Sequence, residues 1–185
     1  MRIISGKFKG IKLISPSSNQ IRPTSDRGKE TIFNVLNSIF IKRKINLSEL
    51  VVLDCFCGSG SLGVESISRG AKTVYFLDSC KMALEISRKN CELINSLKSS
   101  NFLKFDFAST SKISIKANLF FLDAPYNKFN IKSIIENLYL KGLIKNKSIG
   151  VVELSHQEKE VNFEGFEIIN IKKVSQSKFI FLEKK

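Results

Sequence analysis

The stretch at residues 51–63, VVLDCFCGSGSLG, has residue types and a spacing that could hold a nucleotide-like ligand. An apolar run leads into the spacing Gly58-x-Gly60-x-x-Gly63, which is typical of a strand that turns into a helix. Glycines allow positive φ angles and let the backbone approach a ligand closely. A tight turn without a ligand would have the same spacing, so the glycines alone leave both interpretations open.

Asp54 narrows the kind of ligand that this loop could bind. A dinucleotide would bring a phosphate to this place, and a carboxylate just before Gly58 would repel it. S-adenosylmethionine has an ammonium group and no phosphate, and a carboxylate near that ammonium is favourable, directly or through water. We therefore predict that S-adenosylmethionine is the cofactor and that Asp54 contacts it together with these loop residues: Phe56, Gly58, Ser59 and Gly60.

A second stretch, Asp123-Ala124-Pro125-Tyr126, suits methyl transfer to the exocyclic amine of a nucleic-acid base. Such an amine is a poor nucleophile, because its lone pair is delocalised into the ring. The carboxylate of Asp123 and the backbone carbonyl of Ala124 can accept its N–H groups, and Pro125 favours an extended Ala124. Tyr126 offers an aromatic face on which the base can stack. Positioning by these residues would supply most of the rate gain without a metal.

Alternating strands and helices must position these residues. We predict strands at 51–53, 73–77, 102–105, 119–122, 149–154, 166–171 and 178–182. We predict helices from 24 or 25 to about 42, from the glycine turn to Gly70, at 81–97 and at about 131–140. The alternation through residue 154 predicts an α/β fold with a parallel sheet and helices on both faces. No helix separates the last two strands, so we expect them to form an antiparallel hairpin.

Further acidic residues stand at predicted strand ends. Asp78 lies one βαβ step after Asp54, where a carboxylate can accept hydrogen bonds from ribose hydroxyls, and a helix N-cap is the alternative. Asp106 could accept a hydrogen bond from an adenine amino group, and a loop aspartate that caps a turn is the alternative. The other residues that we assign to the cofactor site are Phe107, which could pack on the purine, Thr24 and Ser79.

Residues 1–23 are basic and are predicted to form a small β-hairpin with glycines at its turns. Cations interleave with Phe8, which suits contact with RNA phosphates, and a solvated edge ribbon is the alternative. The predicted RNA-binding residues are Arg2, Lys7, Lys9, Lys12, Arg22 and Arg27. We expect one domain over residues 1–185, with a helix and its connection at 24–48 and a catalytic core at 49–185.

The composition favours a polyanionic partner. Thirty Lys and Arg residues against 17 Asp and Glu residues give a net charge of +13. Nucleic acid is the first candidate and an anionic membrane surface the second, although a lysine-rich composition bias would look the same. No run is long enough to span a membrane, and no signal-peptide stretch begins the chain. The four cysteines form no C-x-x-C pair, so we expect no metal site and buried, reduced thiols in a cytoplasmic protein. We also expect a monomer.

Nearly the whole chain resembles the bacterial 16S ribosomal RNA guanine-N2 methyltransferases. Residues 54–60 match the D-x-F-x-G-S-G form of methyltransferase motif I, and residues 123–126 are similar to the D/N-P-P-Y/F motif. More specific to the family is an N-terminal block that includes RIISG at 2–6, RPT at 22–24, DR at 26–27, ET at 30–31 and FN at 33–34.

The resemblance implies a fold, a substrate and a partner. The implied fold is a Rossmann-like, seven-stranded methyltransferase sheet, mostly parallel with an antiparallel last strand, and an N-terminal β-hairpin extension. The implied activity is transfer of a methyl group from S-adenosylmethionine to the exocyclic N2 amine of a guanine. The implied partner is 16S ribosomal RNA within the small ribosomal subunit or its assembly intermediate.

Two departures from the family pattern leave other functions open. Ala124 replaces the first proline of the D/N-P-P-Y/F motif, which removes a fixed φ but keeps the carbonyl. Val174-Ser175-Gln176 stands where we expect a glycine turn. A DNA adenine or cytosine amino methyltransferase would share both motifs but would usually carry a target-recognition domain. An NAD-dependent oxidoreductase leaves Asp54 and residues 123–126 unexplained, and Ala124 favours a ribosome-assembly factor with reduced activity.

Overall fold

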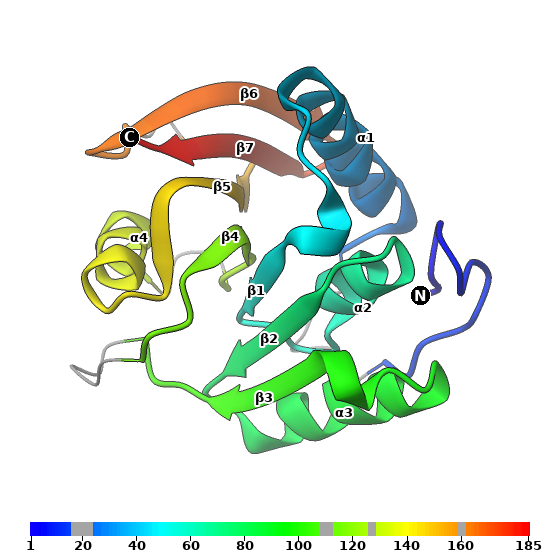
Figure 1. Cartoon of the computed structure of the whole chain (residues 1–185). Helices are drawn as coiled ribbons and strands as arrows, with labels where there is room; N and C mark the ends of the chain where they lie inside the picture. The colour runs from blue at the N-terminus through cyan, green and yellow to red at the C-terminus, as the bar shows by residue number, and fades with distance from the viewer. Residues whose placement is uncertain (16–23, 108–112, 126–128, 159–161) are drawn as a thin grey trace.

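The computed structural model describes residues 1–15, 24–107, 113–125, 129–158 and 162–185. In this part of the chain, seven strands form one sheet with the order β3-β2-β1-β4-β5-β7-β6 (Figure 1). The strands are β1 (Val51–Cys55), β2 (Thr73–Asp78), β3 (Ser100–Lys104), β4 (Ala117–Leu122), β5 (Ile144–Ser155), β6 (Phe166–Val174) and β7 (Ser177–Lys184). The first five are parallel, whereas β7 runs antiparallel to both β5 and β6. The predicted Rossmann-like methyltransferase sheet is confirmed.

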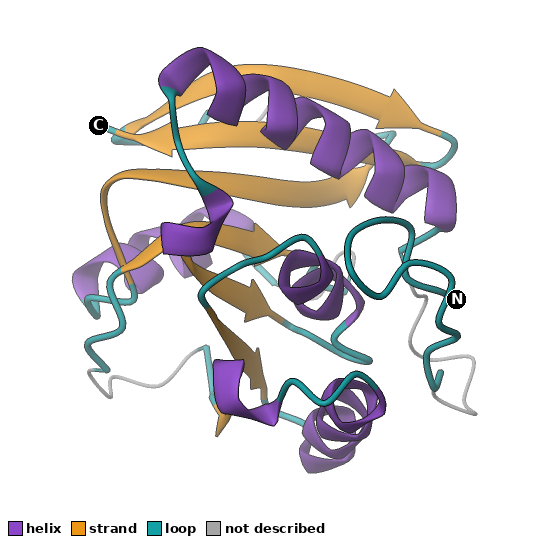
Figure 2. Ribbon diagram, turned by 45° about the vertical axis from the view of Figure 1, so that its right-hand side comes forward, coloured by secondary structure: helices purple, strands orange, loops and turns teal. Residues whose placement is uncertain are grey.

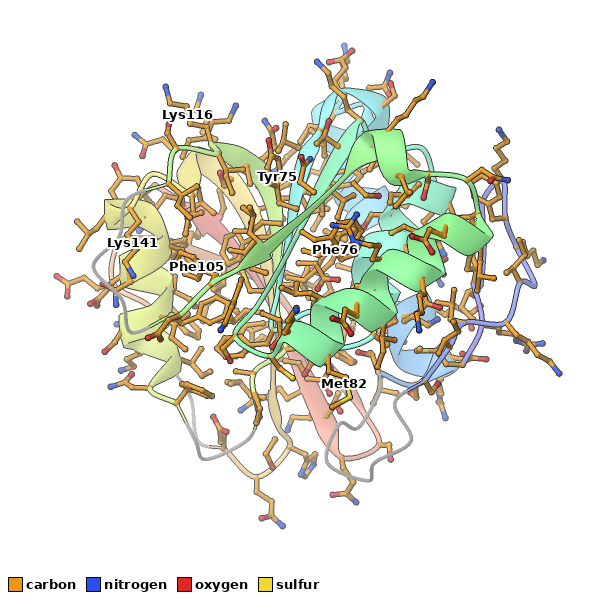
Figure 3. All side chains as sticks on the ribbon, turned by 90° about the horizontal axis from the view of Figure 1, so that it is seen from below. Tyr75, Phe76, Met82, Phe105, Lys116 and Lys141 are labelled. Carbon is orange, nitrogen blue, oxygen red and sulfur yellow. The ribbon has the colours of Figure 1, made fainter. Side chains whose placement is uncertain are left out.

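Helices cover both faces of this sheet, as predicted. The helices α1 (Asp26–Arg43), α2 (Ser61–Ser68) and α3 (Lys81–Leu93) pack on one face, and α4 (Ile131–Leu140) packs on the other (Figure 1). Figure 2 shows α1 lying along the strands of the C-terminal hairpin. Phe76 of β2 lies on the side of α3, and Phe105 lies near α4 (Figure 3). The buried side chains therefore form two layers of core, one on each side of the sheet.

The helix ends follow from local capping. Ser25, rather than Thr24, is the N-cap of α1, and its hydroxyl accepts a hydrogen bond from the Gly28 amide at 3.0 Å. The predicted helix at 81–97 is wrong at its C-terminal end, because α3 ends at Leu93. Asn95 then takes a positive φ of 51°, and the chain continues into the short 3-10 helix η2 (Leu97–Ser99). A second 3-10 helix, η1 (Leu47–Glu49), leads into β1.

The C-terminal hairpin of β6 and β7 is confirmed. Its tight turn has Ser175 at a φ of 53°, where we expected a glycine. Serine can adopt this left-handed conformation at a modest steric cost, so the hairpin closes without glycine. The departure from the family pattern at this turn therefore leaves the sheet intact.

The two predicted arms of the N-terminal hairpin pair in antiparallel fashion, with a bridge between Arg2 and Lys12 and hydrogen bonds from the Ile3 amide to the Ile11 carbonyl at 2.9 Å and from the Leu13 amide to the Met1 carbonyl at 3.1 Å. The pairing is short, and residues 1–15 form no regular strand. The amides of Ile4 and Ser5 donate to the carboxylate of Glu65 on α2, at 2.8 Å and 3.0 Å. The segment therefore docks on α2, and we call residues 1–15 the N-terminal segment.

The cysteines mostly follow the expectation of buried thiols. Cys55, Cys57 and Cys91 are buried, and burial raises the pKa of each of these thiols. Cys80, the N-cap of α3, is exposed. The expectation was therefore wrong for Cys80.

Candidate active site at the C-terminal ends of the strands

Strand register brings the predicted site residues to one edge of the sheet. Cys55 at the end of β1 lies beside Leu77 of β2 and beside Leu122 of β4. Asp78 follows Leu77, and Asp123 follows Leu122. Neighbouring strands are about 4.8 Å apart, so the backbones of the two aspartates lie ~10 Å apart, on either side of the glycine loop. Ligands in such sheets bind at this edge, where the strand order reverses between β1 and β4.

Close packing explains two of the glycines in the loop between β1 and α2. A Cβ atom at Gly63 would stand 2.2 Å from the Phe76 ring. At Gly60, which has a φ of 74°, a Cβ atom would stand 2.8 Å from the Ser87 hydroxyl. Gly58 also has a positive φ, of 54°. The spacing that predicts a ligand is thus also required for α2 and the loop to pack on β2 and α3.

Asp54 lies beneath this loop. Its side chain is 2% exposed, and Oδ2 accepts a hydrogen bond from the Gly63 amide at 2.9 Å. Burial, followed by the nearby Asp78 carboxylate, raises the pKa of Asp54 to about 7, although the Gly63 hydrogen bond opposes the rise. A cation near this carboxyl would favour its ionised form, which fits the ammonium group predicted for the ligand.

Asp78 supports the loop from the neighbouring strand. Oδ2 accepts from the Gly58 amide at 3.0 Å, and Oδ1 accepts from the Cys80 amide at 2.9 Å. A carboxylate can accept about four hydrogen bonds, so these two leave capacity for the predicted ribose hydroxyls. The neighbouring Ser79 is exposed. The alternative that Asp78 is the N-cap of the following helix is wrong, because Cys80 is the N-cap of α3 and Asp78 accepts the amide of Cys80 rather than one within the helix.

An aromatic cluster lies beside the loop. The ring of Phe56, which has a φ of 56°, stacks on Phe107 with centroids 3.9 Å apart. Phe107 is buried and also meets Phe105 edge-on at 5.0 Å, whereas Asp106 between them is exposed. Phe129 contacts Phe56 at 4.9 Å and is 44% exposed. Phe107 thus has Phe56 against one face, and Phe129 is an exposed aromatic that the sequence analysis missed.

Asp123 meets a residue from the other end of the domain. Thr24 is buried, and its Oγ1 donates to Asp123 Oδ2 at 3.1 Å across 99 positions of sequence. Ala124 is buried and Pro125 is exposed, whereas Tyr126 lies outside the described residues. Thr24, which we assigned to the cofactor, therefore contacts the predicted catalytic carboxylate.

The basic residues of the N-terminal segment face solvent. Lys7, Lys9 and Lys12 are exposed, as is Arg27 at the start of α1. Arg2 is also exposed, and its Nε donates to Asp26 at 3.1 Å. Arg22 lies outside the described residues. The arrangement leaves these cations accessible to a polyanion.

Buried polar groups that the sequence analysis missed hold the segment in place. Glu65, only 1% exposed, accepts the Arg69 Nε at 2.8 Å besides two amides of the segment. The ammonium of Lys29 is fully buried and donates to the Arg2 carbonyl, and burial lowers its pKa. A Cβ atom at Gly6 would stand 2.0 Å from the carbonyl oxygen of Ser68, so the segment touches α2 closely. Nothing in the spacing of these residues indicated the contacts.

Two further features of the structure bear on metal binding and membrane insertion. Among the described residues, no group of three or more His, Cys, Asp or Glu side chains could hold a metal ion. No helix in the described ranges is long and apolar enough to cross a membrane.

The chain is similar to methyltransferases of known sequence and structure. The chain is 37% identical to ribosomal RNA small subunit methyltransferase D of Haemophilus influenzae, over 76% of this chain and 74% of that protein. It is 31% identical to the protein of that name in Escherichia coli, over 83% of this chain and 74% of that protein. A candidate methyltransferase structure from Escherichia coli matches the fold with a TM-score of 0.81 and 24% identity, over 100% of this chain and 98% of that one.

A family model described as Conserved hypothetical protein 95 matches residues 1–183, including the N-terminal block and both motifs. The match extends over the N-terminal segment, which docks on α2, and over the glycine loop and the Asp123 loop, which follow the neighbouring strands β1 and β4. The chain therefore belongs to this family, the ribosomal RNA small subunit methyltransferase D family of bacteria.

Proposed function

We propose that this chain transfers a methyl group from S-adenosylmethionine to the exocyclic N2 amine of a guanine in 16S ribosomal RNA. The observation that carries the proposal is the strand register, which sets Asp78 and Asp123 on either side of one glycine loop. One carboxylate is thereby available to the cofactor and the other to the base. Because ribosomal subunits are the proposed partner, the protein would act in the cytoplasm.

The residues around the loop fit S-adenosylmethionine. Asp78 has hydrogen-bonding capacity left for ribose hydroxyls, and the buried Asp54 would balance the ammonium group. Gly58 and Gly60 place no side chain at their own positions in the loop, so the backbone there can approach the cofactor, and Phe56 and Phe129 offer aromatic surface beside it. When bound, the cofactor supplies an electrophilic methyl group on a sulfonium sulfur.

The Asp123 loop would hold the base. The Asp123 carboxylate accepts an N–H of the target amine and stabilises the positive charge that develops on its nitrogen. The carbonyl of Ala124 accepts the second N–H, so that the amine lone pair turns out of the ring plane. Tyr126 stacks on the base. These residues would act by position and charge. The nitrogen would lose one proton for each methyl group that it gains, and the Asp123 carboxylate, which accepts one of its N–H groups, would take that proton.

The relatives and the charge of the chain support an RNA substrate. The two curated relatives carry names that specify small-subunit ribosomal RNA. A net charge of +13 and the exposed cations of the N-terminal segment suit a phosphate backbone. A type II methyltransferase from Vibrio matches as well, but over only 44% of this chain and 21% of that protein. The relatives named for ribosomal RNA match most of this chain, so RNA is the proposed substrate.

The direct test identifies the methylated base. Purified protein, labelled S-adenosylmethionine and small subunits from a strain that lacks the enzyme should yield N2-methylguanine in 16S ribosomal RNA. Naked 16S ribosomal RNA and duplex DNA serve as parallel substrates. Label in an adenine or cytosine of DNA, or no label in any substrate, would overturn the proposal.

The RNA contact has its own prediction. Changing Lys7, Lys9 and Lys12 to glutamine should weaken binding to small subunits and flatten the slope of log affinity against log salt. The expected change in slope is about 0.7–0.9 for each phosphate that the protein no longer neutralises. A matched control changes three exposed lysines at the amino ends of β4 and β5: Lys116, Lys145 and Lys147. Equal slopes in the two triple variants would mean that the N-terminal segment is only a solvated ribbon.

A further inference from the structure

The hydrogen bond from Thr24 to Asp123 joins the N-terminal part of the domain to the proposed catalytic carboxylate. The Thr24 hydroxyl donates to Oδ2 at 3.1 Å, and Thr24 is only 7% exposed. We propose that Thr24 is a positioning residue, which fixes the orientation of the Asp123 carboxylate relative to the target amine. The inference rests on the proposed function of Asp123 as an acceptor for that amine.

Thr24 is held firmly enough for this role. It directly precedes the N-cap Ser25, whose hydroxyl and carbonyl accept the Gly28 and Lys29 amides at 3.0 Å and 2.9 Å. A Cβ atom at Gly28 would stand 3.2 Å from both the Thr24 methyl carbon and the Phe179 ring. The buried side chain of Thr24 therefore packs closely on the first turn of α1, as does the Phe179 ring of β7. Its hydroxyl is directed by packing, at little further entropic cost.

The orientation of the Asp123 carboxylate depends on such a partner, because Asp123 lies in a loop. β4 ends at Leu122, so the sheet fixes the backbone only up to the preceding residue, and the Asp123 side chain is only partly buried. A carboxylate can turn about its side-chain bonds, and a hydroxyl that donates to one oxygen restricts that rotation. A misplacement of about 1 Å at a catalytic group can cost on the order of 100-fold in rate. The Thr24 bond thus acts on rate through Asp123 without touching the reacting atoms.

Substitutions at Thr24 test this role against the cofactor role that its sequence position first indicated. Thr24→Val keeps the shape and removes the hydroxyl. We expect the single-turnover rate on small subunits to fall by about 10- to 100-fold. KM for small subunits and Kd for S-adenosylmethionine should stay within about twofold. Thr24→Ser retains the hydroxyl and should restore the rate to within about threefold of wild type.

A double-mutant cycle with Asp123→Ala connects the effect to the carboxylate. If Thr24 acts through Asp123, adding Thr24→Val to Asp123→Ala should lower the rate no further. Thermal unfolding of each variant checks that the fold is retained, and Thr24→Ala supplies a second hydroxyl-free variant.

The outcomes separate the inference from the proposed function. A slow Asp123→Ala together with a wild-type rate in Thr24→Val and Thr24→Ala would overturn the inference and leave the proposed function standing. A wild-type rate in Asp123→Ala would overturn the role of Asp123, and the inference with it. A raised Kd for S-adenosylmethionine at an unchanged rate in Thr24→Val would overturn the inference and mean that Thr24 binds the cofactor. Additive losses in the double variant would also overturn the inference.

Discussion

Two loops lie at the same edge of the sheet but are held in different ways. The cofactor loop, residues 56–60, connects β1 to α2, and the Asp123 loop begins directly after β4. Around the cofactor loop, Asp54 and Asp78 are almost fully buried and accept main-chain amides that lie 9, 20 and 2 positions away. In the Asp123 loop, the carboxylate is partly exposed, and its bond to Thr24 spans 99 positions. The cofactor loop is organised mainly by contacts within β1 to α3, with one longer contact from the Ser59 hydroxyl to the Met1 sulfur at 3.6 Å, whereas Asp123 is bonded to a residue 99 positions away.

This difference indicates how each region depends on the rest of the domain. The cofactor loop forms when β1, α2, β2 and the start of α3 pack together. The geometry of Asp123 needs α1 to dock as well, because the first turn of α1 holds Thr24. Changes in the N-terminal part of the domain should therefore affect catalysis more than cofactor binding.

The largest effect that would sharpen this comparison is expected from Asp123→Ala. Removal of one preorganised electrostatic interaction should lower turnover by about 10²–10³-fold, while Kd for S-adenosylmethionine stays unchanged. Asp123→Asn should be milder, because an amide oxygen still accepts a hydrogen bond. Single-turnover methylation of small subunits gives the rates, and calorimetry gives Kd. A parallel loss of cofactor binding would mean that the two regions are not separate.

The burial of Asp54 predicts a pH dependence that belongs to the cofactor loop alone. Its folded-state pKa is about 7, against an ordinary value of 3.8. The folded state thus binds more protons between these values, so the free energy of unfolding should fall as the pH rises from about 4 to about 7, and then level off. Each pKa unit corresponds to about 1.36 kcal/mol, so the whole decline amounts to a few kcal/mol at most.

Asp54→Asn should remove most of that decline, because an amide has no proton to lose and can still accept the Gly63 hydrogen bond. Urea unfolding of the ligand-free protein across this pH range gives the comparison. Asp123→Asn is the control, and we expect it to leave the decline in place. Identical pH profiles for wild type and Asp54→Asn would show that the Asp54 carboxyl is solvated rather than buried.

Asp78→Ala should weaken cofactor binding, which Asp123→Ala is expected to leave unchanged. Loss of hydrogen bonds to ribose hydroxyls costs on the order of 1–3 kcal/mol, which weakens cofactor binding by about 5- to 100-fold. Binding to small subunits should not change. Glu85→Ala removes an exposed carboxylate from α3 and is the matched control for calorimetry. Wild-type cofactor affinity in Asp78→Ala would leave Asp78 only its structural role beneath the loop.

The smallest effect is expected from Ala124→Pro. Residue 124 follows the end of β4, so a proline there removes no bond within that strand and stiffens the loop that carries Asp123. We expect a single-turnover rate equal to wild type or higher, with unchanged cofactor affinity. A tenfold lower rate would show that the amide or the limited space at this buried position matters more than stiffness.

Local patterns were sufficient to predict most of the fold. The apolar runs predicted all seven strands, and the absence of a helix between residues 166–171 and 178–182 predicted the antiparallel hairpin. The errors lie where tertiary contacts compete with local preference. The N-terminal hairpin pairs as predicted but forms no regular strands, and the amides of Ile4 and Ser5 bond to Glu65 on α2 instead. The end of α3 was misplaced because Asn95 adopts a positive φ.

The sequence by itself determined which carboxylates would meet at one edge of the sheet. Asp54, Asp78 and Asp123 end or follow parallel strands, and the ends of parallel strands lie together whatever packs around them. Only the tertiary structure decided what each carboxylate touches: main-chain amides for Asp54 and Asp78, and the Thr24 hydroxyl for Asp123. It also decided that the Lys29 ammonium is buried against the Arg2 carbonyl. Periodicity specifies which face of an element is buried, but the packing of distant elements decides which side chains meet across them.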